Sequence, residues 1–397
     1  MRHQLPVYSP ISLRGICSAT SEVAARRTAV IQSAARLLER TYNADRAVLC
    51  GSGTQALRLA LRVTAQWLGS LPVAALPVFT CYDVGTAAVG AGSPVMLYDI
   101  DPGTLGPDIA SLRQALESGA RVVVVSPLYG VPLDWGAVCD CVAPYAAVII
   151  EDAAQGHGAS WQGRPLGSLG QVSVVSFGRG KGWTGMGGGA LLLRGEIAAT
   201  VDARVAGSAF GVELKTMVNA TAQWALGRPS LYGLPASIPW LGLGETIYKK
   251  PAAVHQIATT SAALIMHSQA TAFAEAAARR ARAAELLGRL PARPGIRTIE
   301  VPDGSVPGYL RFPLRLAGGM SGFSSRTQAQ RLGIAPSYPT TLSALEAVQQ
   351  QMAAGRRNQW LGGEELSRQL VTVPTHTRLT EADRAGVLRL LDTYSER

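Results

Sequence analysis

The chain has 397 residues, of which 47% are hydrophobic and 16% are charged, and its formal net charge at pH 7 is +10. This composition excludes an intrinsically disordered protein and predicts a compact globular chain with one large and one smaller domain. The positive charge favours an anionic partner, such as a nucleotide diphosphate, an acidic membrane surface or a nucleic acid. Because no basic run has interleaved aromatic residues, we expect no nucleic-acid partner.

The beginning of the chain gives an expectation about its compartment. Residues 1–22 lack the apolar core of a secretion signal, and no stretch is apolar for the length of a membrane span. The five cysteines form an odd set without the spacing of a zinc site. We therefore expect a cytoplasmic protein with reduced thiols and no metal site.

Strands alternate with helices over the first half of the chain. A helical pattern over 27–40 precedes a short buried strand at 46–50, and a glycine turn then opens a helix at 51–69. This alternation predicts an α/β fold with a mostly parallel sheet that is covered on both faces. Further apolar runs predict strands at 71–75, 94–101, 121–127, 145–152 and 172–177.

The pattern changes at about residue 255. A long alanine-rich helix is expected over 255–290, and short apolar segments follow it. The closing amphipathic helix begins at the sequence Thr-Glu-Ala-Asp, residues 380–383. We therefore predict a large α/β domain over 1–254 and a smaller α+β domain over 255–397.

Segment 219–243 is unusually apolar. It contains two tryptophans and three prolines but a single charged residue. One interpretation is a loop that packs on the domain or at a dimer interface. The other is a surface that faces a membrane or a lipid-linked substrate.

The glycine turn after the first strand has the sequence CGSGTQAL (50–57), which is similar to a dinucleotide-binding fingerprint. A nicotinamide site also needs an acidic residue near the end of the second strand, but residues 51–82 contain no Asp or Glu. The backbone N–H groups of Ser52, Gly53 and Thr54 at a helix N-terminus can instead bind a phosphate. An ordinary strand–helix turn is the alternative.

A strand over 145–152 ends in two carboxylates, Glu151 and Asp152, which point to opposite faces if both lie in the strand. One of them could pair with a protonated ring nitrogen, and a polar strand end is the alternative. His157 follows closely, either as a substrate contact or as a hydrogen-bonded structural histidine.

Lys181 lies in a glycine-rich stretch after the last predicted strand, and it is one of only four lysines among 37 basic residues. A desolvated lysine amine can act as a nucleophile, whereas arginine stays protonated. A phosphate-binding turn, a strand-end Asp and such a lysine are the parts that a pyridoxal phosphate enzyme needs. The lysine forms a Schiff base, and the Asp keeps the pyridine nitrogen protonated.

These pieces also match one known family in order and spacing. The motifs are GTQAL (53–57), PVFT (77–80), DAAQGHGA (152–159), SFGRGK (176–181) and GGG (187–189). With them the chain resembles the DegT/DnrJ/EryC1/StrS family of sugar aminotransferases over nearly its whole length. The resemblance implies the fold-type I architecture of aspartate aminotransferase, a pyridoxal phosphate cofactor and a homodimer.

The resemblance also implies roles for single residues. Lys181 would be the Schiff-base lysine and general base, and Asp152 the partner of the pyridine nitrogen. Gln155 would lie near the ring. Ser52, Gly53, Thr54 and Ser176 would hold the phosphate, while His157 and Tyr338 are candidate substrate contacts.

Three positions depart from the family pattern. The aromatic residue expected after the PxxT threonine is Cys81, with Tyr82 next to it as a candidate for stacking on the ring. Gly187 stands where a Glu commonly precedes the glycine pair. The family's G-x-N-x-R segment is not recognisable, and GETIYKK (244–250) lies near its place.

The leading hypothesis is an aminotransferase that moves an amino group, expected from L-glutamate, to a nucleotide-linked keto-sugar in amino-sugar, polysaccharide or natural-product biosynthesis. A keto-cyclitol or a lipid-linked sugar is the alternative substrate. A sugar dehydratase of the same family would carry histidine in place of Lys181. A non-catalytic binding or regulatory protein on the same fold is the last alternative.

Overall fold

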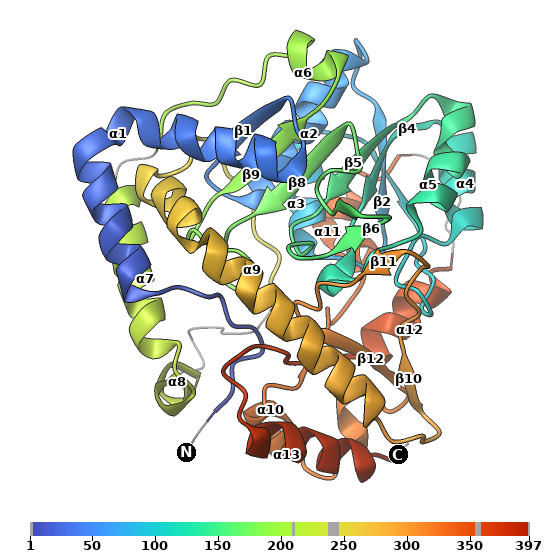
Figure 1. Cartoon of the computed structure of the whole chain (residues 1–397). Coiled ribbons are helices and arrows are strands. Elements are labelled where there is room, and N and C mark those ends of the chain that lie inside the picture. Colours follow the sequence, from blue (N-terminus) through green and yellow to red (C-terminus); the bar gives the residue numbers. More distant parts are fainter. Residues whose placement is uncertain (1–2, 209–210, 237–245, 354–358, 396–397) are drawn as a thin grey trace.

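The computed structural model describes residues 3–208, 211–236, 246–353 and 359–395. A seven-stranded sheet has the order β1-β9-β8-β5-β4-β2-β3 and forms the centre of the larger part of the chain (Figure 1). Strands β3, β2, β4, β5 and β8 are parallel, and β9 is antiparallel to both of its neighbours. The strands are β1 (Arg46–Cys50), β2 (Val73–Pro77), β3 (Val95–Tyr98), β4 (Ala120–Val125), β5 (Val148–Asp152), β8 (Val172–Ser176) and β9 (Gly189–Leu193).

The sequence-based prediction of an α/β fold with a mostly parallel sheet is confirmed, and six of the seven strands overlap with the predicted apolar runs. Strand β9 was not predicted, because its five residues follow a glycine run that reads as a turn. Between the strands lie helices α2 (Gly53–Trp67), α3 (Tyr82–Ala91), α4 (Ile109–Glu117) and α5 (Trp135–Val142). Helix α2 packs on β1, β8 and β9, while α4 packs on β3, β4 and β2.

Helix α1 (Leu13–Tyr42) begins much earlier than the predicted helix over 27–40. Ser12 caps it by accepting a hydrogen bond from the N–H of Gly15. Arg26 has non-helical backbone angles (φ −143°, ψ 37°), so α1 consists of two helical pieces, and the periodic pattern identified only the second. Helix α1 lies along α9 (Thr259–Gly288), as Figure 1 shows.

A second, antiparallel sheet has the order β10-β12-β14-β13 and lies in the C-terminal part of the chain. Its strands are β10 (Ile296–Thr298), β12 (Phe312–Leu316), β13 (Ala335–Pro336) and β14 (Leu370–Val373). Helix α13 (Glu381–Asp392) packs in the same hydrophobic core, and Thr380 and Asp383 form its capping box. The first half of α9 lies in the core of the large sheet, and Ala283 and Leu286 of its last turns lie in this second core.

The apolar segment 219–243 is only partly described. Its first residues end α7 (Val212–Leu226), which packs on α1 and α9, and the next form α8 (Pro229–Ala236). Residues 237–245 lie outside the described residues. Among the described helices, none combines the length and the apolar character that a membrane crossing requires.

Candidate active site

A cavity of about 360 Å³ opens where strands of the large sheet end. In parallel sheets the carboxyl ends of the strands meet at one edge, and ligands bind beyond that edge. The cavity is lined by residues 51–54 after β1, Ser126 after β4, Asp152 and Gln155 at the end of β5, and Ser176 and Lys181 at the end of β8. Residues that are far apart in the sequence therefore share one small volume.

The turn at residues 52–54, which we call the phosphate-binding turn after its expected ligand, forms one end of this cavity. Ser52 caps α2, because its hydroxyl accepts a hydrogen bond of 3.2 Å from the N–H of Gln55. Gly53 and Thr54 supply N–H groups in the first turn of the helix, where the helix dipole favours an anion. A Cβ atom on Gly53 would lie 2.7 Å from the Cβ atom of Ser176, so the serine forms the wall opposite the turn.

Within the glycine run 187–189, Gly188 and Gly189 allow close packing. Gly188 has a φ of +95°, and its N–H donates a hydrogen bond of 3.1 Å to the carbonyl of Gly51. A Cβ atom on Gly189 would come within 2.6 Å of the Cα atom of Gly53. Both glycines allow β9 to lie close against the phosphate-binding turn.

Asp152 and Lys181 both line the cavity. Asp152 accepts hydrogen bonds from the Ser126 hydroxyl at 3.4 Å and from the Ala154 N–H at 3.2 Å. Burial raises the pKa of the Asp152 carboxyl, and the positive charge of Lys181 opposes this rise. A cationic ring nitrogen beside Asp152 would favour its ionised form in the same way.

Glu151 has a different environment from its neighbour Asp152, as the alternation of a strand predicts. Its carboxylate is fully buried and accepts hydrogen bonds from the N–H groups of Gly167 at 2.6 Å and Leu169 at 2.9 Å. The Ser173 hydroxyl donates a further bond of 2.9 Å. Glu151 therefore holds the chain around 167–173, and of the two carboxylates only Asp152 lines the cavity.

Gln155 connects the cavity to a cluster of aromatic rings. Its amide oxygen accepts a hydrogen bond of 2.9 Å from the N–H of Tyr129, and its amide nitrogen donates one of 2.8 Å to the Tyr338 hydroxyl. Tyr338 stacks on Tyr129 and packs edge-on against Phe79. Tyr338 does not line the cavity but lies behind Gln155 and fixes the orientation of its amide.

At the start of α3, Cys81 lines the cavity and Tyr82 does not. Tyr82 is buried, and its hydroxyl accepts a hydrogen bond of 3.1 Å from the N–H of Thr340. Burial raises the pKa of the Cys81 thiol to about 12. The side chain that this side of the cavity presents is thus a small protonated thiol.

His157 lies apart from the cavity. Its ring packs against Trp183 and Phe273, with ring centroids 5.3 Å and 4.9 Å away. Burial, followed by the positive charge of Arg279, lowers the pKa of His157 to about 3, so the ring is neutral at physiological pH. His157 instead lines a different pocket, together with Tyr42 and Arg280.

Two groups of residues line the cavity although the sequence did not predict them as site residues. The first is Thr80, whose hydroxyl is buried at the cavity and has no hydrogen-bond partner among the described residues. The PVFT motif contains this residue, so a signal for it was present. The second is a set of cations, Arg58, Arg179, Lys249 and Lys250, for which the Lys-Lys pair was the only local signal.

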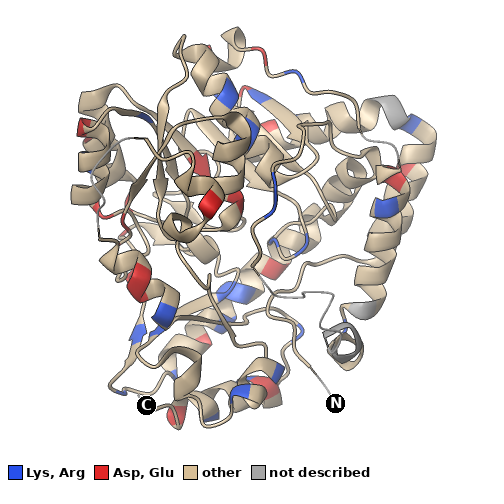
Figure 2. Cartoon of the chain, turned by 180° about the vertical axis from the view of Figure 1, so that it is seen from behind, with Lys and Arg blue, Asp and Glu red and all other residues tan. Residues whose placement is uncertain are grey.

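The backbone that carries the two lysines is fixed in place. The Thr86 hydroxyl donates a hydrogen bond of 2.9 Å to the carbonyl of Lys249, and a guanidinium nitrogen of Arg58 donates one of 2.6 Å to the carbonyl of Ala252. Elsewhere blue basic and red acidic residues are intermixed along the chain (Figure 2). The local cations at the cavity are therefore a better indication of an anionic ligand than the net charge.

The residues of the cavity fit pyridoxal phosphate. The phosphate-binding turn and Ser176 match its anionic end, Asp152 matches a protonated ring nitrogen, and Lys181 supplies an amine. The partnerless Thr80 hydroxyl is one more group that a ligand in the cavity could satisfy.

Comparison with known proteins gives an independent result. The model of the DegT/DnrJ/EryC1/StrS aminotransferase family matches residues 29–392. The chain is 33% identical over 177 residues to the L-glutamine:2-deoxy-scyllo-inosose aminotransferase of Streptoalloteichus tenebrarius, which covers 43% of this chain and 41% of that protein. It is 31% identical over 128 residues to the UDP-N-acetyl-3-dehydro-alpha-D-glucosamine 3-aminotransferase of Acidithiobacillus ferrooxidans, covering 32% and 34%.

These matches span less than half of the curated relatives' lengths, whereas the structural likeness extends over the whole chain. The structure of an Escherichia coli GDP-4-keto-6-deoxy-D-mannose-3-dehydratase with bound hydrated PLP covers all of both chains, at a TM-score of 0.75 and 15% identity. At this identity the likeness shows the fold. The expected fold class, a fold-type I architecture, is therefore confirmed.

Proposed function

The chain belongs to the DegT/DnrJ/EryC1/StrS aminotransferase family, and from this premise we propose that it is a pyridoxal phosphate-dependent aminotransferase. Its amino donor is L-glutamate and its acceptor is a keto-sugar linked to a nucleotide. The observation that carries this proposal is that Lys181 and Asp152 face one cavity, next to the phosphate-binding turn.

Each residue has a part in this function. When bound, pyridoxal phosphate would supply the electron sink through which an amino group passes between donor and acceptor. The phosphate-binding turn and Ser176 would hold its phosphate, and the Asp152 carboxylate would keep a proton on the ring nitrogen. The Lys181 amine would bond to the cofactor and move the proton that changes position during transfer.

The surroundings of the cavity support an anionic substrate. Lys249, Lys250 and Arg58 lie at the cavity, where a diphosphate would find several positive charges. A relative that is named for a UDP-linked keto-sugar supports the same class of acceptor. Another relative is named for scyllo-inosose chemistry, which makes a keto-cyclitol the second candidate acceptor.

Two further features belong to the proposal. We propose a homodimer, because α7 carries Leu214 and Val218 with 72% and 59% of their surface exposed, and a second subunit could cover such residues. We also propose that the protein works in the cytoplasm, where a nucleotide-sugar is available. Lys181 and Asp152 together argue against a purely regulatory protein on this fold.

Absorbance spectroscopy of the purified protein with pyridoxal phosphate tests this proposal. The wild type should show a visible cofactor band that shifts to the ultraviolet when L-glutamate is added, and L-glutamine serves as the alternative donor. Lys181→Ala should show neither the band nor the shift. Lys215→Ala removes an exposed lysine of α7 and should behave as the wild type.

The outcomes separate the alternatives. A band that neither amino acid shifts would contradict the aminotransferase function and leave a different pyridoxal phosphate reaction. Absence of any band in the wild type would favour the non-catalytic binding protein. A panel of nucleotide-linked keto-sugars and keto-cyclitols is then offered to the donor-treated protein. The compound that restores the visible band is the acceptor.

A further inference from the structure

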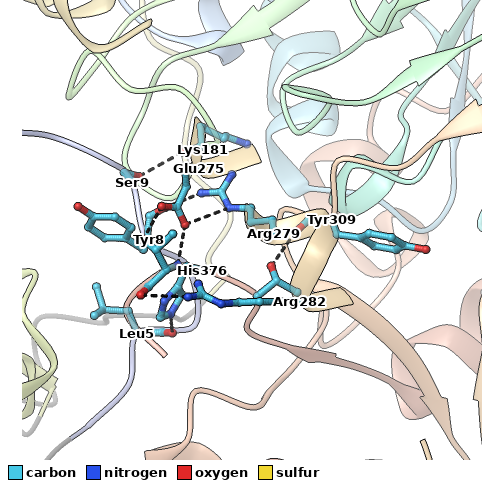
Figure 3. Close-up of polar contacts among 11 residues, drawn as sticks. Leu5, Tyr8, Ser9, Lys181, Glu275, Arg279, Arg282, Tyr309 and His376 are labelled. Atoms are coloured by element: carbon cyan, nitrogen blue, oxygen red, sulfur yellow. Dashed lines mark hydrogen bonds and ion pairs between the residues drawn. The ribbon is translucent and has the colours of Figure 1, made fainter. Parts of the chain in front are cut away.

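The N-terminal segment 4–9 begins against α13 and ends beside the active-site lysine, where Figure 3 shows Ser9 next to Lys181. Gln4 and Ser9 at its two ends are completely buried. The segment contains no helix or strand, so its position depends on bonds to other parts of the chain. Burial of such an irregular segment requires that its polar groups find partners, and those partners show what it is connected to.

Ser9 bonds directly to the backbone that carries Lys181. Its hydroxyl accepts a hydrogen bond of 2.8 Å from the N–H of Gly180 and lies 3.3 Å from the carbonyl of Lys181, to which it donates. Within the described residues, no other side chain makes a hydrogen bond to the backbone of 178–182. One serine hydroxyl thus contacts the peptide group before Gly180 and the peptide group after Lys181.

The turn at residues 178–182, which we call the Lys181 turn, has little hydrogen bonding of its own. Three of its residues, Gly178, Gly180 and Gly182, are glycines, and Gly180 has a φ of +78°. Glycine has the greatest backbone freedom, so this turn has little conformational preference of its own. Its internal support is one hydrogen bond of 3.3 Å, from the N–H of Lys181 to the carbonyl of Gly178.

Ser9 is itself held by a buried arginine. Arg279 of α9 is completely buried and donates a hydrogen bond of 2.7 Å to the carbonyl of Tyr8. Glu275, one turn earlier, pairs with Arg279 at 3.9 Å and accepts a hydrogen bond of 2.8 Å from the N–H of Thr377. A buried ion pair within α9, whose Glu275 also bonds to Thr377 in the C-terminal part of the chain, therefore fixes the residue that precedes Ser9.

The rest of the segment is tied to the same C-terminal part. The His376 ring nitrogen Nε2 lies 2.8 Å from the carbonyl of Leu5, and Gln4 donates a hydrogen bond of 2.7 Å to Asp383 of α13. Arg378 stacks over the ring of Tyr8 with its guanidinium carbon 4.9 Å from the ring centre. Segment 4–9 is thus anchored at its beginning, middle and end.

We propose that Ser9 is a positioning residue for Lys181 and that segment 4–9 holds it against the Lys181 turn. The proposal rests on the proposed function, because it gives the lysine its catalytic role. Reaction of an amine with a bound group depends on placement within a fraction of an ångström. Loss of the Ser9 hydroxyl leaves Lys181 in the cavity but frees the peptide that orients it.

The test compares Ser9→Ala with Ser12→Ala. Both variants lose one hydroxyl that accepts a backbone N–H bond, but Ser12 caps α1 and does not contact the Lys181 turn. Hydrogen exchange of the cofactor-free proteins is measured for peptides covering 177–184. We expect exchange of the Gly180 amide to rise by about 10-fold or more in Ser9→Ala only.

The same variants are then loaded with pyridoxal phosphate. Ser9→Ala should form the visible band about 10- to 100-fold more slowly, and its kcat should fall by a similar factor with the KM for the donor unchanged. Ser9→Thr retains the hydroxyl and should recover most of the band-formation rate. Thermal unfolding of all variants, followed by circular dichroism, identifies any that fail to fold.

Equal exchange in Ser9→Ala and Ser12→Ala would overturn the proposal. So would faster exchange in Ser9→Ala without a slower formation of the band, because the hydroxyl would then stabilise the turn without positioning the amine. If wild-type protein forms a band that no donor shifts, the proposed function fails, yet exchange and band formation still decide the role of Ser9.

Discussion

Gly189 at the start of β9 lies so close to Gly53 at the start of α2 that a Cβ atom on Gly189 would be 2.5 Å from the Gly53 nitrogen. That nitrogen belongs to the phosphate-binding turn. No backbone atom can yield to such a contact without moving the turn, because β9 is paired on both sides, with β1 and β8. The glycine therefore determines where the turn can lie.

Gly189→Ala should consequently weaken cofactor binding. The methyl group would push the N–H groups of the turn away from the phosphate, and we expect the Kd for pyridoxal phosphate to rise by at least about 10-fold. Fluorescence titration of the cofactor-free protein measures this Kd. Gly288→Ala, at the end of α9, places a methyl group in open space and should bind the cofactor as the wild type does.

Unchanged cofactor affinity in Gly189→Ala would contradict this role of the glycine. Loss of stability without loss of affinity would have the same meaning, because the methyl group would then disturb the sheet alone. The Gly288→Ala protein shows how much of any change comes from replacing a glycine as such.

The sequence predicted the part of the fold that depends on local pattern. Buried strands such as β4 are unbroken apolar runs, and Asp152 stands out because it ends one such run, while Lys181 stands out in the glycine-rich stretch after another. The second half of α1 was predicted by its periodicity, but the first half, before the break at Arg26, was not. Local pattern thus identified strands and strand ends and failed where a helix changes direction.

Contacts between distant segments could not be predicted in this way. Ser9 precedes Lys181 by 172 residues and is an ordinary serine in the sequence. Cys81 and Tyr82 are neighbours, and which of them lines the cavity depends on the bond that Thr340 makes to the Tyr82 hydroxyl. The sequence contains these residues, but their contacts are determined by how the two parts of the chain pack together.

Asp152→Asn should make the cofactor-free protein more stable and the enzyme less active. Burial raises the pKa of Asp152, so ionising this group costs stability in the folded state. Its contribution is complete below the unfolded-state pKa of about 3.9 and is lost as pH rises through the folded-state pKa. The variant should therefore unfold at a higher temperature than the wild type at pH 7, with a difference that disappears toward pH 4.

Activity of the same variant should fall by about 100-fold or more, because a neutral amide cannot hold a proton on the ring nitrogen. Differential scanning calorimetry across pH and single-turnover absorbance measurements check the two parts. Asp392→Asn changes an exposed carboxyl of α13 and provides the control. A wild type that is more stable than Asp152→Asn at neutral pH would contradict the assignment of the raised pKa.

Cys81 should resist alkylation in the folded protein. Its pKa of about 12 leaves almost no thiolate at neutral pH, and the thiolate is the reactive form. Iodoacetamide at about pH 8 should modify the exposed Cys17 and leave Cys81 unmodified over the same time, as mass spectrometry of the digested protein would show. Cys81 should react once the protein is denatured. Labelling of both cysteines at the same rate in the folded protein would show that the thiol is open to solvent and ionised.

The lysines at the cavity should determine how salt affects ligand binding. Lys249 and Lys250 are exposed at a cavity that Arg58 also lines, so a diphosphate bound there would interact with charges that salt can screen. We expect uridine diphosphate to bind the wild type less tightly as sodium chloride increases. Lys249→Ala combined with Lys250→Ala should raise the Kd by about 10-fold and flatten this dependence, since two of the screened charges are gone.

Isothermal titration calorimetry of the protein loaded with pyridoxal phosphate measures both quantities, because the cofactor then occupies the phosphate-binding turn and cannot be displaced unnoticed. Lys215→Ala removes one positive charge from exposed α7, away from the cavity, and shows the effect of a change in net charge alone. If it weakens binding as much as the double variant does, the net charge attracts the ligand. If the double variant alone is weaker and less sensitive to salt, the two lysines form part of the substrate site, and the acceptor carries a phosphate-rich group.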